Sequence, residues 1–318
     1  MAWEDAIVEC VVNINTAHRS EVIDLMIEQV TRTGLSVIHR DSGVDADRTV
    51  LTLLGRPNKF LAGIDSLYQV AVGEGLDISI YKGNHPSVGI VDVVPFVPIK
   101  DITMEELQTM VRDWAPYIAD KYDLPIVYYG SMAHSLKSQY LSHIRKGGIA
   151  TAKKRLSDGQ LIVDYGPQQT HTTLGLSCWT VRDLMVAYNV SLDTQELSVA
   201  KAIANEIKIK RTTSPNLKEV RVLGWKTPHF NCCQISANVY DISTMTMSMF
   251  FHIVEQEAKT YGVEVKGSEL IGVAPYAGYD KDASPATMDE LVDSLGLSVH
   301  APFIWEQRVL EKLTRYSA

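Results

Sequence analysis

Short apolar runs alternate with longer segments of helical periodicity along the first 130 residues, and this alternation predicts an α/β fold. Residues 6–13 are a compact apolar run typical of a buried strand, and residues 20–34 carry apolar side chains at helical spacing before a glycine. Thr103 and Glu106 have the spacing of a capping box, which predicts the start of a helix. The same criteria predict strands at 36–41, 48–54, 89–97 and 124–130 and helices at 58–75 and 103–120.

The alternation is interrupted over residues 134–178, which are richer in Lys, Gly, Gln and Thr and are typical of a short helix with functional loops. It then resumes, and residues 267–272 are interpreted as a turn between apolar segments. The elements predicted after the interruption are a strand reaching 192, a helix over 194–209, strands at 218–224 and 232–239, and a helix over 244–260. We therefore expect two packed α/β (α+β) subdomains with mixed sheets, residues 1–178 and 179–318.

The charge balance favours a small-molecule partner. The chain carries 30 Lys and Arg against 38 Asp and Glu, a formal net charge of −8. This argues against binding of nucleic acid, although a local basic pocket could hold an anion. No apolar stretch approaches membrane-spanning length, and acidic residues precede the first apolar run, so we expect a soluble cytoplasmic protein that does not bind membranes.

The cysteine pattern predicts reduced, buried thiols. Cys10, Cys178, Cys232 and Cys233 show no Cys-x-x-Cys spacing. The adjacent pair is not a zinc ligand set, and we expect no metal site.

His85 lies in the stretch "KGNHPSVGIVDVVPFVPI", where a Gly/Asn/Pro turn leads directly into an apolar strand. An imidazole titrates near neutral pH and can remove one proton and return another, so this histidine is a candidate general acid and base. The alternative is a hydrogen-bonded structural histidine of the turn, and the residues alone leave both interpretations open.

Charged residues elsewhere are candidates for ligand binding. Asp41 follows a predicted strand and could orient an imidazole or cap the turn after it, and Arg48 could bind a ligand or pair with Asp41, Asp45 or Asp47. A basic cluster could attract an anionic tail or form a solvated helix face; its members are Arg145, Lys146, Lys153, Lys154 and Arg155.

Residues 164–175, "DYGPQQTHTTLG", combine glycine, proline, amides, hydroxyls and His171 in a loop suited to the edge of a heterocycle, or in an ordinary surface connection. The chain lacks a P-loop, Gly-x-Gly-x-x-Gly, His-Glu-x-x-His and Gly-x-Ser-x-Gly, which removes the common nucleotide, zinc-protease and serine-hydrolase interpretations.

Several stretches occur in one order from end to end: "VVNIN" and "SEVID" near the start, "DRTVLTLLG" (47–55), "KGNHPSVGIVDVVPFVPI" (82–99), "LSHIRKG" (141–147), "DYGP" (164–167), "VAYNVSL" (186–192), "LGWK" (223–226), "CQISANVYD" (233–241), "KGSELIGVAP" (266–275) and the tail "LGLSVHAPFIWEQRVLEKL" (295–313). Together they resemble the glutamate formiminotransferase family, the transferase part of formiminotransferase-cyclodeaminase. The resemblance covers essentially the whole chain.

The resemblance implies two α/β subdomains with a folate-binding tunnel between them, a homodimer, and transfer of a formimino group from N-formiminoglutamate to N5 of tetrahydrofolate. Tetrahydrofolate would be the one-carbon acceptor. The chain shows no cyclodeaminase segment, so we expect a separate protein to perform ring closure and ammonia release.

The resemblance also assigns residues. His85 corresponds to the catalytic histidine of a Gly-Glu-His-Pro turn, with Asn84 in place of the glutamate, and Asp41 to an aspartate that would hold the imidazole in its useful tautomer. The residues it implies for folate binding are Asn13, Arg48, Lys82, Gly83, Gly166, Pro167, His171 and Gly175.

The chain departs from the family pattern near His85, because Ser87 stands where the family has an arginine that could hold a substrate carboxylate. Two alternatives to formimino transfer therefore remain. One is a formyltransferase that uses N-formylglutamate or a related donor. The other is a catalytically inactive pterin-binding relative.

Overall fold

The computed structural model describes residues 3–314, and the chain divides into two compact units after Asp183. The boundary expected after residue 178 falls inside strand β6 (Ser177–Val181), which pairs with β4 (Val91–Lys100) and β5 (Ile126–Tyr128) of the first unit. Because a strand cannot leave its sheet without losing these ladder hydrogen bonds, the division follows β6.

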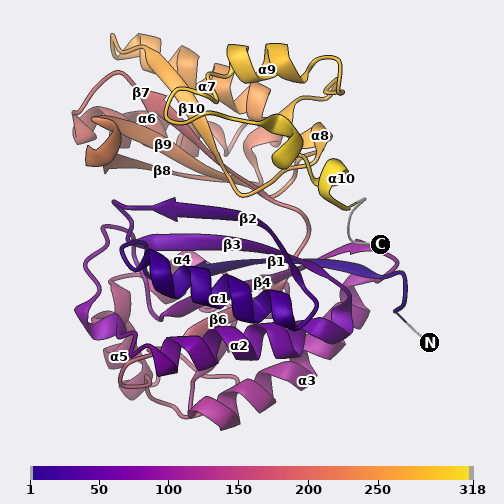
Figure 1. The fold of residues 1–318 in the computed structure, drawn as a ribbon. Coiled ribbons are helices and arrows are strands. Elements are labelled where there is room, and N and C mark those ends of the chain that lie inside the picture. Colours follow the sequence, from indigo (N-terminus) through magenta and orange to yellow (C-terminus); the bar gives the residue numbers. More distant parts are fainter. Residues whose placement is uncertain (1–2, 315–318) are drawn as a thin grey trace. The chain divides into compact units, whose positions relative to one another are not determined.

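The first unit contains a six-stranded mixed sheet in the order β2-β3-β1-β4-β6-β5 (Figure 1). The pairs among β2, β3, β1 and β4 are antiparallel, and β4, β6 and β5 run parallel. The remaining elements are β1 (Ile7–Ile14), β2 (Ser36–Gly43), β3 (Arg48–Gly55), α1 (Ser20–Arg32), α2 (Phe60–Gly73), α3 (Met104–Tyr122), α4 (Leu141–Arg145) and α5 (Gly148–Ser157). The sequence therefore predicted β1 to β5 and the three long helices, with small differences at their ends. It did not predict β6, because residues 134–178 were interpreted as a short helix with loops and the next strand as one run reaching residue 192.

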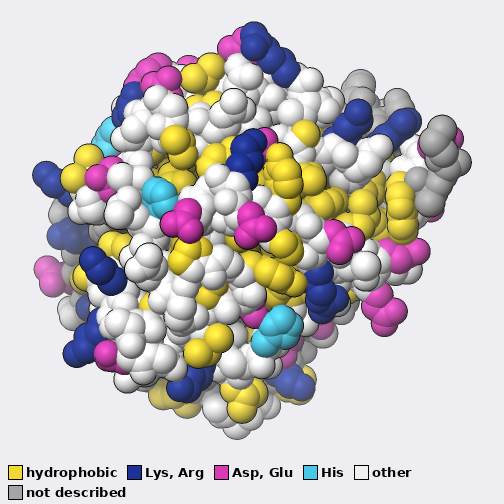
Figure 2. Space-filling view, turned by 90° about the horizontal axis from the view of Figure 1, so that it is seen from below, with side chains coloured by type: hydrophobic (Ala, Val, Ile, Leu, Met, Phe, Trp, Pro, Cys, Tyr) yellow, Lys and Arg dark blue, Asp and Glu magenta, His cyan; other side chains and the backbone are white. Residues whose placement is uncertain are grey.

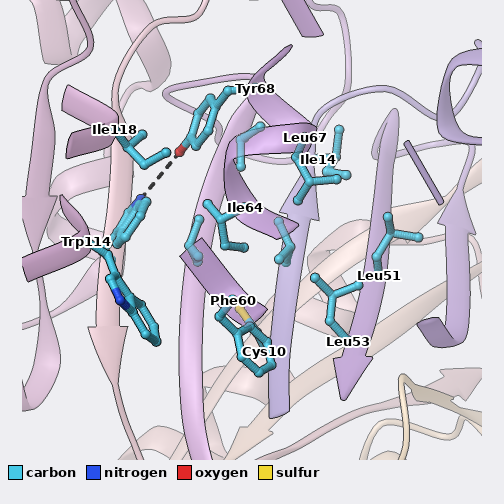
Figure 3. Packing of buried hydrophobic residues seen from close by; sticks show 14 of the residues in the cluster. Cys10, Ile14, Leu51, Leu53, Phe60, Ile64, Leu67, Tyr68, Trp114 and Ile118 are labelled. Atoms are coloured by element: carbon cyan, nitrogen blue, oxygen red, sulfur yellow. Dashed lines mark hydrogen bonds between the residues drawn. The ribbon is translucent and has the colours of Figure 1, made fainter. Parts of the chain in front are cut away.

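Helices cover both faces of this sheet. Helices α1, α2 and α3 pack on one face around a large apolar core, in which the α2 residues Phe60 and Ile64 lie against Cys10 of β1 and Leu53 of β3 (Figure 3). Side chains of β4, β5 and β6 that point to the other face of the sheet form a separate apolar cluster with α4 and α5. On β1 the residues between the core positions include polar ones, and that polar face carries the site described below.

The predicted capping box of α3 is confirmed. The Thr103 hydroxyl accepts from the Glu106 amide at 3.2 Å, and the Glu106 carboxylate accepts from the Thr103 amide at 2.8 Å. These contacts satisfy amides that the first helical turn leaves without partners.

The second unit has a four-stranded antiparallel sheet in the order β10-β7-β9-β8, packed on helices around its own core. Its elements are β7 (Val186–Leu192), α6 (Leu197–Lys210), β8 (Val220–Thr227), β9 (Cys232–Val239), α7 (Met247–Thr260), β10 (Val265–Ile271), α8 (Tyr276–Tyr279), α9 (Met288–Ser294) and α10 (Leu310–Leu313). The elements from β7 to β10 follow the same βαββαβ order along the chain as those from β1 to β4. The order of strands within the sheet is also the same, with β8-β9-β7-β10 corresponding to β2-β3-β1-β4, so both units share one supersecondary plan.

The turn predicted at residues 267–272 is wrong, because most of this stretch belongs to β10 and pairs with β7. Gly267 suggested a turn, but it lies at a shift in strand register with φ of 150°. A Cβ there would be 2.8 Å from the Gly296 carbonyl oxygen. The glycine therefore permits close approach of another segment within a strand.

The expected state of the thiols is confirmed, since all four cysteines are buried and free. Within residues 3–314, no helix is long and apolar enough to cross a membrane. In the view of Figure 2, cationic and anionic side chains are interspersed across the visible face. That face has no single-sign field of the kind that attracts a polyelectrolyte.

Glu9 is a buried carboxyl on the polar face of β1, 3% exposed and opposite Leu54 of β3. Burial raises its pKa to about 7, and the charge of Arg182 opposes this rise. The protonated form of Glu9 is therefore favoured in the folded protein at mildly acidic pH.

Candidate active site

Residues 81–87 form the turn that carries His85, between α2 and β4. The Tyr81 hydroxyl donates to the Ala46 carbonyl in the β2–β3 hairpin and, at 3.3 Å, to the carbonyl of His85. A Cβ at Gly83 would lie 2.0 Å from the same Ala46 oxygen. Glycine is therefore required where the turn crosses the hairpin, and the hairpin fixes the position of His85.

The His85 imidazole is partly buried, and its surroundings determine its protonation. Its Nδ1 lies 2.9 Å from the Pro86 carbonyl oxygen. Because a carbonyl can only accept, Nδ1 carries the hydrogen in this contact and Nε2 keeps its lone pair. Burial, together with the charges of Arg48 and Arg145, lowers the pKa of His85 well below its ordinary value. The neutral imidazole thus offers Nε2 as a base at physiological pH.

Arg48 begins β3 and is buried among polar groups of the site. Its Nε donates to Asn15 Oδ1 at 3.1 Å, and its Nη2 donates to Ser87 Oγ at 2.7 Å. Ser87 Oγ in turn donates to Asn15 Oδ1 at 3.0 Å. These bonds join β3, the residue after β1 and the turn that carries His85, so Arg48 organises the site rather than lying free on its surface.

The acid that pairs with Arg48 is Asp92 of β4, at 2.9 Å between Nη2 and Oδ2. The sequence left pairing of Arg48 with Asp41, Asp45 or Asp47 open beside ligand binding, and the acid that the fold brings to Arg48 lies further along the chain. One of those neighbours, Asp47, instead accepts from the Ala17 amide at 2.8 Å. Arg48 of β3 reaches Asp92 across β1, because β4 lies next to β1 in the sheet and the two side chains project from the same face.

Asp92 is shared by two arginines. Its Oδ2 also accepts from Arg145 Nη2 at 2.5 Å, and its Oδ1 accepts from the Val88 amide at 3.0 Å. Asp92 is 0% exposed, and each arginine is 8% exposed. Two guanidinium groups on one carboxylate leave an excess positive charge, and burial together with the charge of Arg145 lowers the pKa of Arg48 to about 10. We call Arg48, Asp92 and Arg145 the Arg–Asp–Arg cluster.

The basic cluster predicted from the sequence is not one surface patch. Arg145 faces the sheet from the end of α4, and Arg155 Nη1 donates to the carbonyls of His143 and Ile144 in the same helix. The three lysines of the cluster are exposed: Lys146, Lys153 and Lys154. Helical geometry turns neighbouring charges to different faces, which the sequence run alone does not show.

Asn13 and Asp41 lie on one face of the sheet, since both are opposite Val50 of β3. Their Cα atoms are two strand spacings apart, about 10 Å. Asn13 Oδ1 accepts from Arg48 Nη1 at 3.5 Å, and Asp41 Oδ2 is 3.6 Å from His39 Nε2. The expected contact of Asp41 with His85 stays a prediction. The imidazole nitrogen that an acid would orient is here bonded to a backbone carbonyl.

The end of the 164–175 loop packs against the segment that follows His85. Gly175 has φ of +77°, and a Cβ there would lie 2.2 Å from the Val88 carbonyl oxygen. The Ile90 amide donates to the Leu174 carbonyl at 2.9 Å. The fold thus joins two of the motifs that the sequence analysis identified separately.

The other predicted binding residues lie at varied positions. Gly166, with φ of +86°, packs where a Cβ would be 2.3 Å from the Leu124 carbonyl oxygen, and Lys82 is exposed. His171 Nδ1 accepts from the Leu174 amide at 2.9 Å, so its ring shapes the loop. Pro167 and His171 line a small pocket of about 110 Å³. A role of these residues in folate binding stays a prediction.

Two family models account for nearly the whole chain. The formiminotransferase domain, N-terminal subdomain, matches residues 7–182, and the formiminotransferase domain matches residues 187–314. The chain belongs to the formiminotransferase family. The first match ends at residue 182 and the second begins at residue 187, so the boundary between the two structural units, after Asp183, lies between the two matches.

Relatives within the formiminotransferase family include single-activity and fused proteins. The chain is 32% identical to the glutamate formimidoyltransferase of Streptococcus pyogenes serotype M1 over 270 residues, which are 85% of this chain and 89% of that protein. It is 28% identical to the formimidoyltransferase-cyclodeaminase of Mus musculus over 323 residues, covering 96% of this chain. This chain spans 60% of the length of that mouse relative.

Three residues of this candidate site were missed from the sequence of the formiminotransferase-family chain: Asp92, Asn15 and Ser87 as a hydrogen-bonding partner. Asp92 carried a usable signal, since it is a lone acid in the apolar run "VGIVDVVPFV". A charge in a buried strand requires a partner, which predicts a cation somewhere in the fold. Asn15 and Ser87 carried no comparable signal, because short polar residues are common at strand ends and in turns.

Proposed function

We propose that this protein transfers the formimino group of N-formiminoglutamate to N5 of tetrahydrofolate, with His85 as the proton shuttle. The family membership supports the reaction class, and relatives named glutamate formimidoyltransferase support the donor. The observation that carries the proposal is the neutral His85 imidazole, whose Nδ1 is bonded to a carbonyl and whose Nε2 keeps its lone pair.

The reaction requires one group that takes a proton and returns it. The N5 lone pair forms a bond to the amidine carbon, and the C=N π electrons move to the imino nitrogen. N5 then loses its proton to Nε2 of His85. Collapse of the tetrahedral adduct breaks the bond between that carbon and the glutamate nitrogen, which leaves only when it is protonated. His85 supplies that proton and returns to its neutral state.

Burial and the charges of the Arg–Asp–Arg cluster make the protonated His85 a stronger acid than an ordinary imidazolium. An imidazolium formed here is destabilised by burial and, in addition, by the like charges of Arg48 and Arg145, which together lower the pKa of His85. A strong acid protonates a poor leaving group more completely in the transition state. The same burial and charges therefore keep the base neutral before the reaction and favour return of the proton afterwards.

Binding of the acceptor is proposed to use the residues assigned by the resemblance, which are Asn13, Arg48, Lys82, Gly83, Gly166, Pro167, His171 and Gly175. Contact of the 164–175 loop with the segment after His85 supports a role of that loop beside the reacting groups. Asp41 is proposed to contribute to catalysis from the polar face of β2.

The wider setting is also proposed. The protein would act as a cytoplasmic homodimer in one-carbon metabolism and histidine degradation. A separate cyclodeaminase would consume its product, since some relatives carry both names in one protein.

The test is an assay of the purified protein with tetrahydrofolate and either N-formiminoglutamate or N-formylglutamate, followed by mass spectrometry of the folate product. A formimino product supports the proposal. A formyl product from N-formylglutamate alone would assign the alternative donor. Folate binding without a product from either donor would identify a non-catalytic relative and contradict the proposed function.

A further inference from the structure

The two arginines of the Arg–Asp–Arg cluster are bonded unequally. Arg48 donates from Nε and Nη2 to three side chains of the protein. Arg145 donates from Nη2 to Asp92, but its Nε is buried without a hydrogen-bond partner among residues 3–314. A buried donor without an acceptor is destabilising, more so when it is charged. Nε and Nη2 of Arg48 therefore have partners within the protein, whereas Arg145 keeps an unused donor.

The charge of the cluster is also unbalanced. Asp92 neutralises one guanidinium and leaves about one positive charge in a site that is almost excluded from water. Replacement of Arg145 by a neutral residue would leave a balanced Arg48–Asp92 pair, so charge balance within the cluster does not require the second cation. Both the unused donor and the excess charge indicate an anionic ligand that accepts from Arg145.

We infer that Arg145 holds the α-carboxylate of the amino-acid donor. This inference rests on the proposed function and adds the binding site of the donor. In an α-amino acid the carboxylate carbon is about 2.5 Å from the amino nitrogen, as the bond lengths around Cα dictate. The nitrogen that His85 must protonate therefore brings the α-carboxylate with it to the imidazole.

The cluster lies where that carboxylate must be. Arg48 Nη2, which shares Asp92 with Arg145, is 2.7 Å from Ser87 Oγ and 3.4 Å from the Pro86 carbonyl, on the two residues after His85. The side-chain carboxylate of glutamate is three further carbons along its chain. The carboxylates of the folate tail are separated from N5 by an aromatic ring. The α-carboxylate is the anion that the reaction itself places beside His85.

The experiment compares three donors: N-formiminoglutamate, its α-carboxamide and its γ-carboxamide. With the wild-type protein, the α-carboxamide is expected to lose about 10- to 100-fold in kcat/KM, the scale of a charge-assisted hydrogen bond, and the γ-carboxamide much less. Arg145→Gln should raise KM for N-formiminoglutamate by the same factor and leave KM for tetrahydrofolate within about threefold. In the Arg145→Gln protein, kcat/KM should be the same for N-formiminoglutamate and for its α-carboxamide.

Two further variants complete the design. Arg145→Lys restores the charge without the forked donor and is expected to recover part of the lost affinity. Arg32→Gln makes the same chemical change at an exposed arginine that pairs with Glu28 on α1, and no kinetic constant should change. The melting temperature of Arg145→Gln should not fall, because the remaining pair is balanced.

The outcomes separate the inference from the proposed function. Absence of turnover by the wild-type protein with N-formiminoglutamate would refute the proposed function. Turnover with equal kcat/KM for N-formiminoglutamate and its α-carboxamide would refute the inference alone. Persistence of the α-carboxamide defect in Arg145→Gln would also refute it, as would a drop in melting temperature with parallel losses for both substrates.

Discussion

Substitution of Asp92 by asparagine tests the Arg–Asp–Arg cluster directly. Asparagine has nearly the same shape and keeps one carbonyl oxygen, which can still accept from the Val88 amide. The change removes the negative charge that lies between Arg48 and Arg145. Two buried guanidinium groups would then face each other without compensation.

The magnitude follows from burial and geometry. Asp92 is 0% exposed and accepts from the two arginines at 2.9 and 2.5 Å. Removing one partner of a buried ion pair destabilises proteins by about 3–5 kcal/mol. Because asparagine retains one acceptor, we expect the lower end, about 3 kcal/mol, which for a unit of this size lowers the melting temperature by about 6–12 °C.

Thermal unfolding and urea unfolding of the variant measure this loss. Asp113→Asn, at an exposed position of α3, is the matched control and should change stability by less than about 0.5 kcal/mol. Adding Arg145→Gln to Asp92→Asn reduces the buried charge from two cations to one and should recover part of the lost stability. An Asp92→Asn protein as stable as the wild type, or a double variant less stable than Asp92→Asn, would refute this electrostatic reasoning.

Three further outcomes follow from the site and its surroundings. His85→Ala should lower kcat by roughly a hundredfold or more while the folate Kd measured by calorimetry stays within a few-fold, and wild-type turnover would remove His85 from the mechanism. The value of kcat/KM should begin to fall only below pH 6.5, because the pKa of His85 in the folded protein is lowered from that value. For the same reason the stability that neutral His85 contributes should be present above pH 6.5 and lost as pH falls further. Glu9→Gln should stabilise the protein by up to about 3 kcal/mol in urea unfolding at pH 8 and leave its stability unchanged near pH 4.5. The reason is that the pKa of Glu9 in the folded protein is about 7, so the stability that protonated Glu9 contributes is lost as pH rises through 7. An equal effect at both pH values would contradict this.

Local patterns determined the elements and the position of His85. The spacing of apolar residues and the Thr103–Glu106 box predicted β1, α1 and α3, since these elements satisfy their own backbone hydrogen bonds or bury one regular face. The Gly83-to-Pro86 turn likewise marked the candidate catalytic residue. The error at β10 has the same origin, because a glycine such as Gly267 gives the same local signal in a turn and at a close approach within a strand.

Tertiary structure alone decided which charges meet. The sequence left open a ligand or a nearby acid as the partner of Arg48, but the fold pairs it with Asp92, 44 positions along the chain, and Arg145 joins them from 53 positions beyond Asp92. Electrostatic and hydrogen-bond energies depend on distance and burial, and a sequence gives neither until strand order and helix orientation are known. For that reason the sequence by itself predicted an α/β scaffold and a candidate acid–base histidine, whereas only the fold showed that burial and a buried excess of positive charge lower the pKa of that histidine.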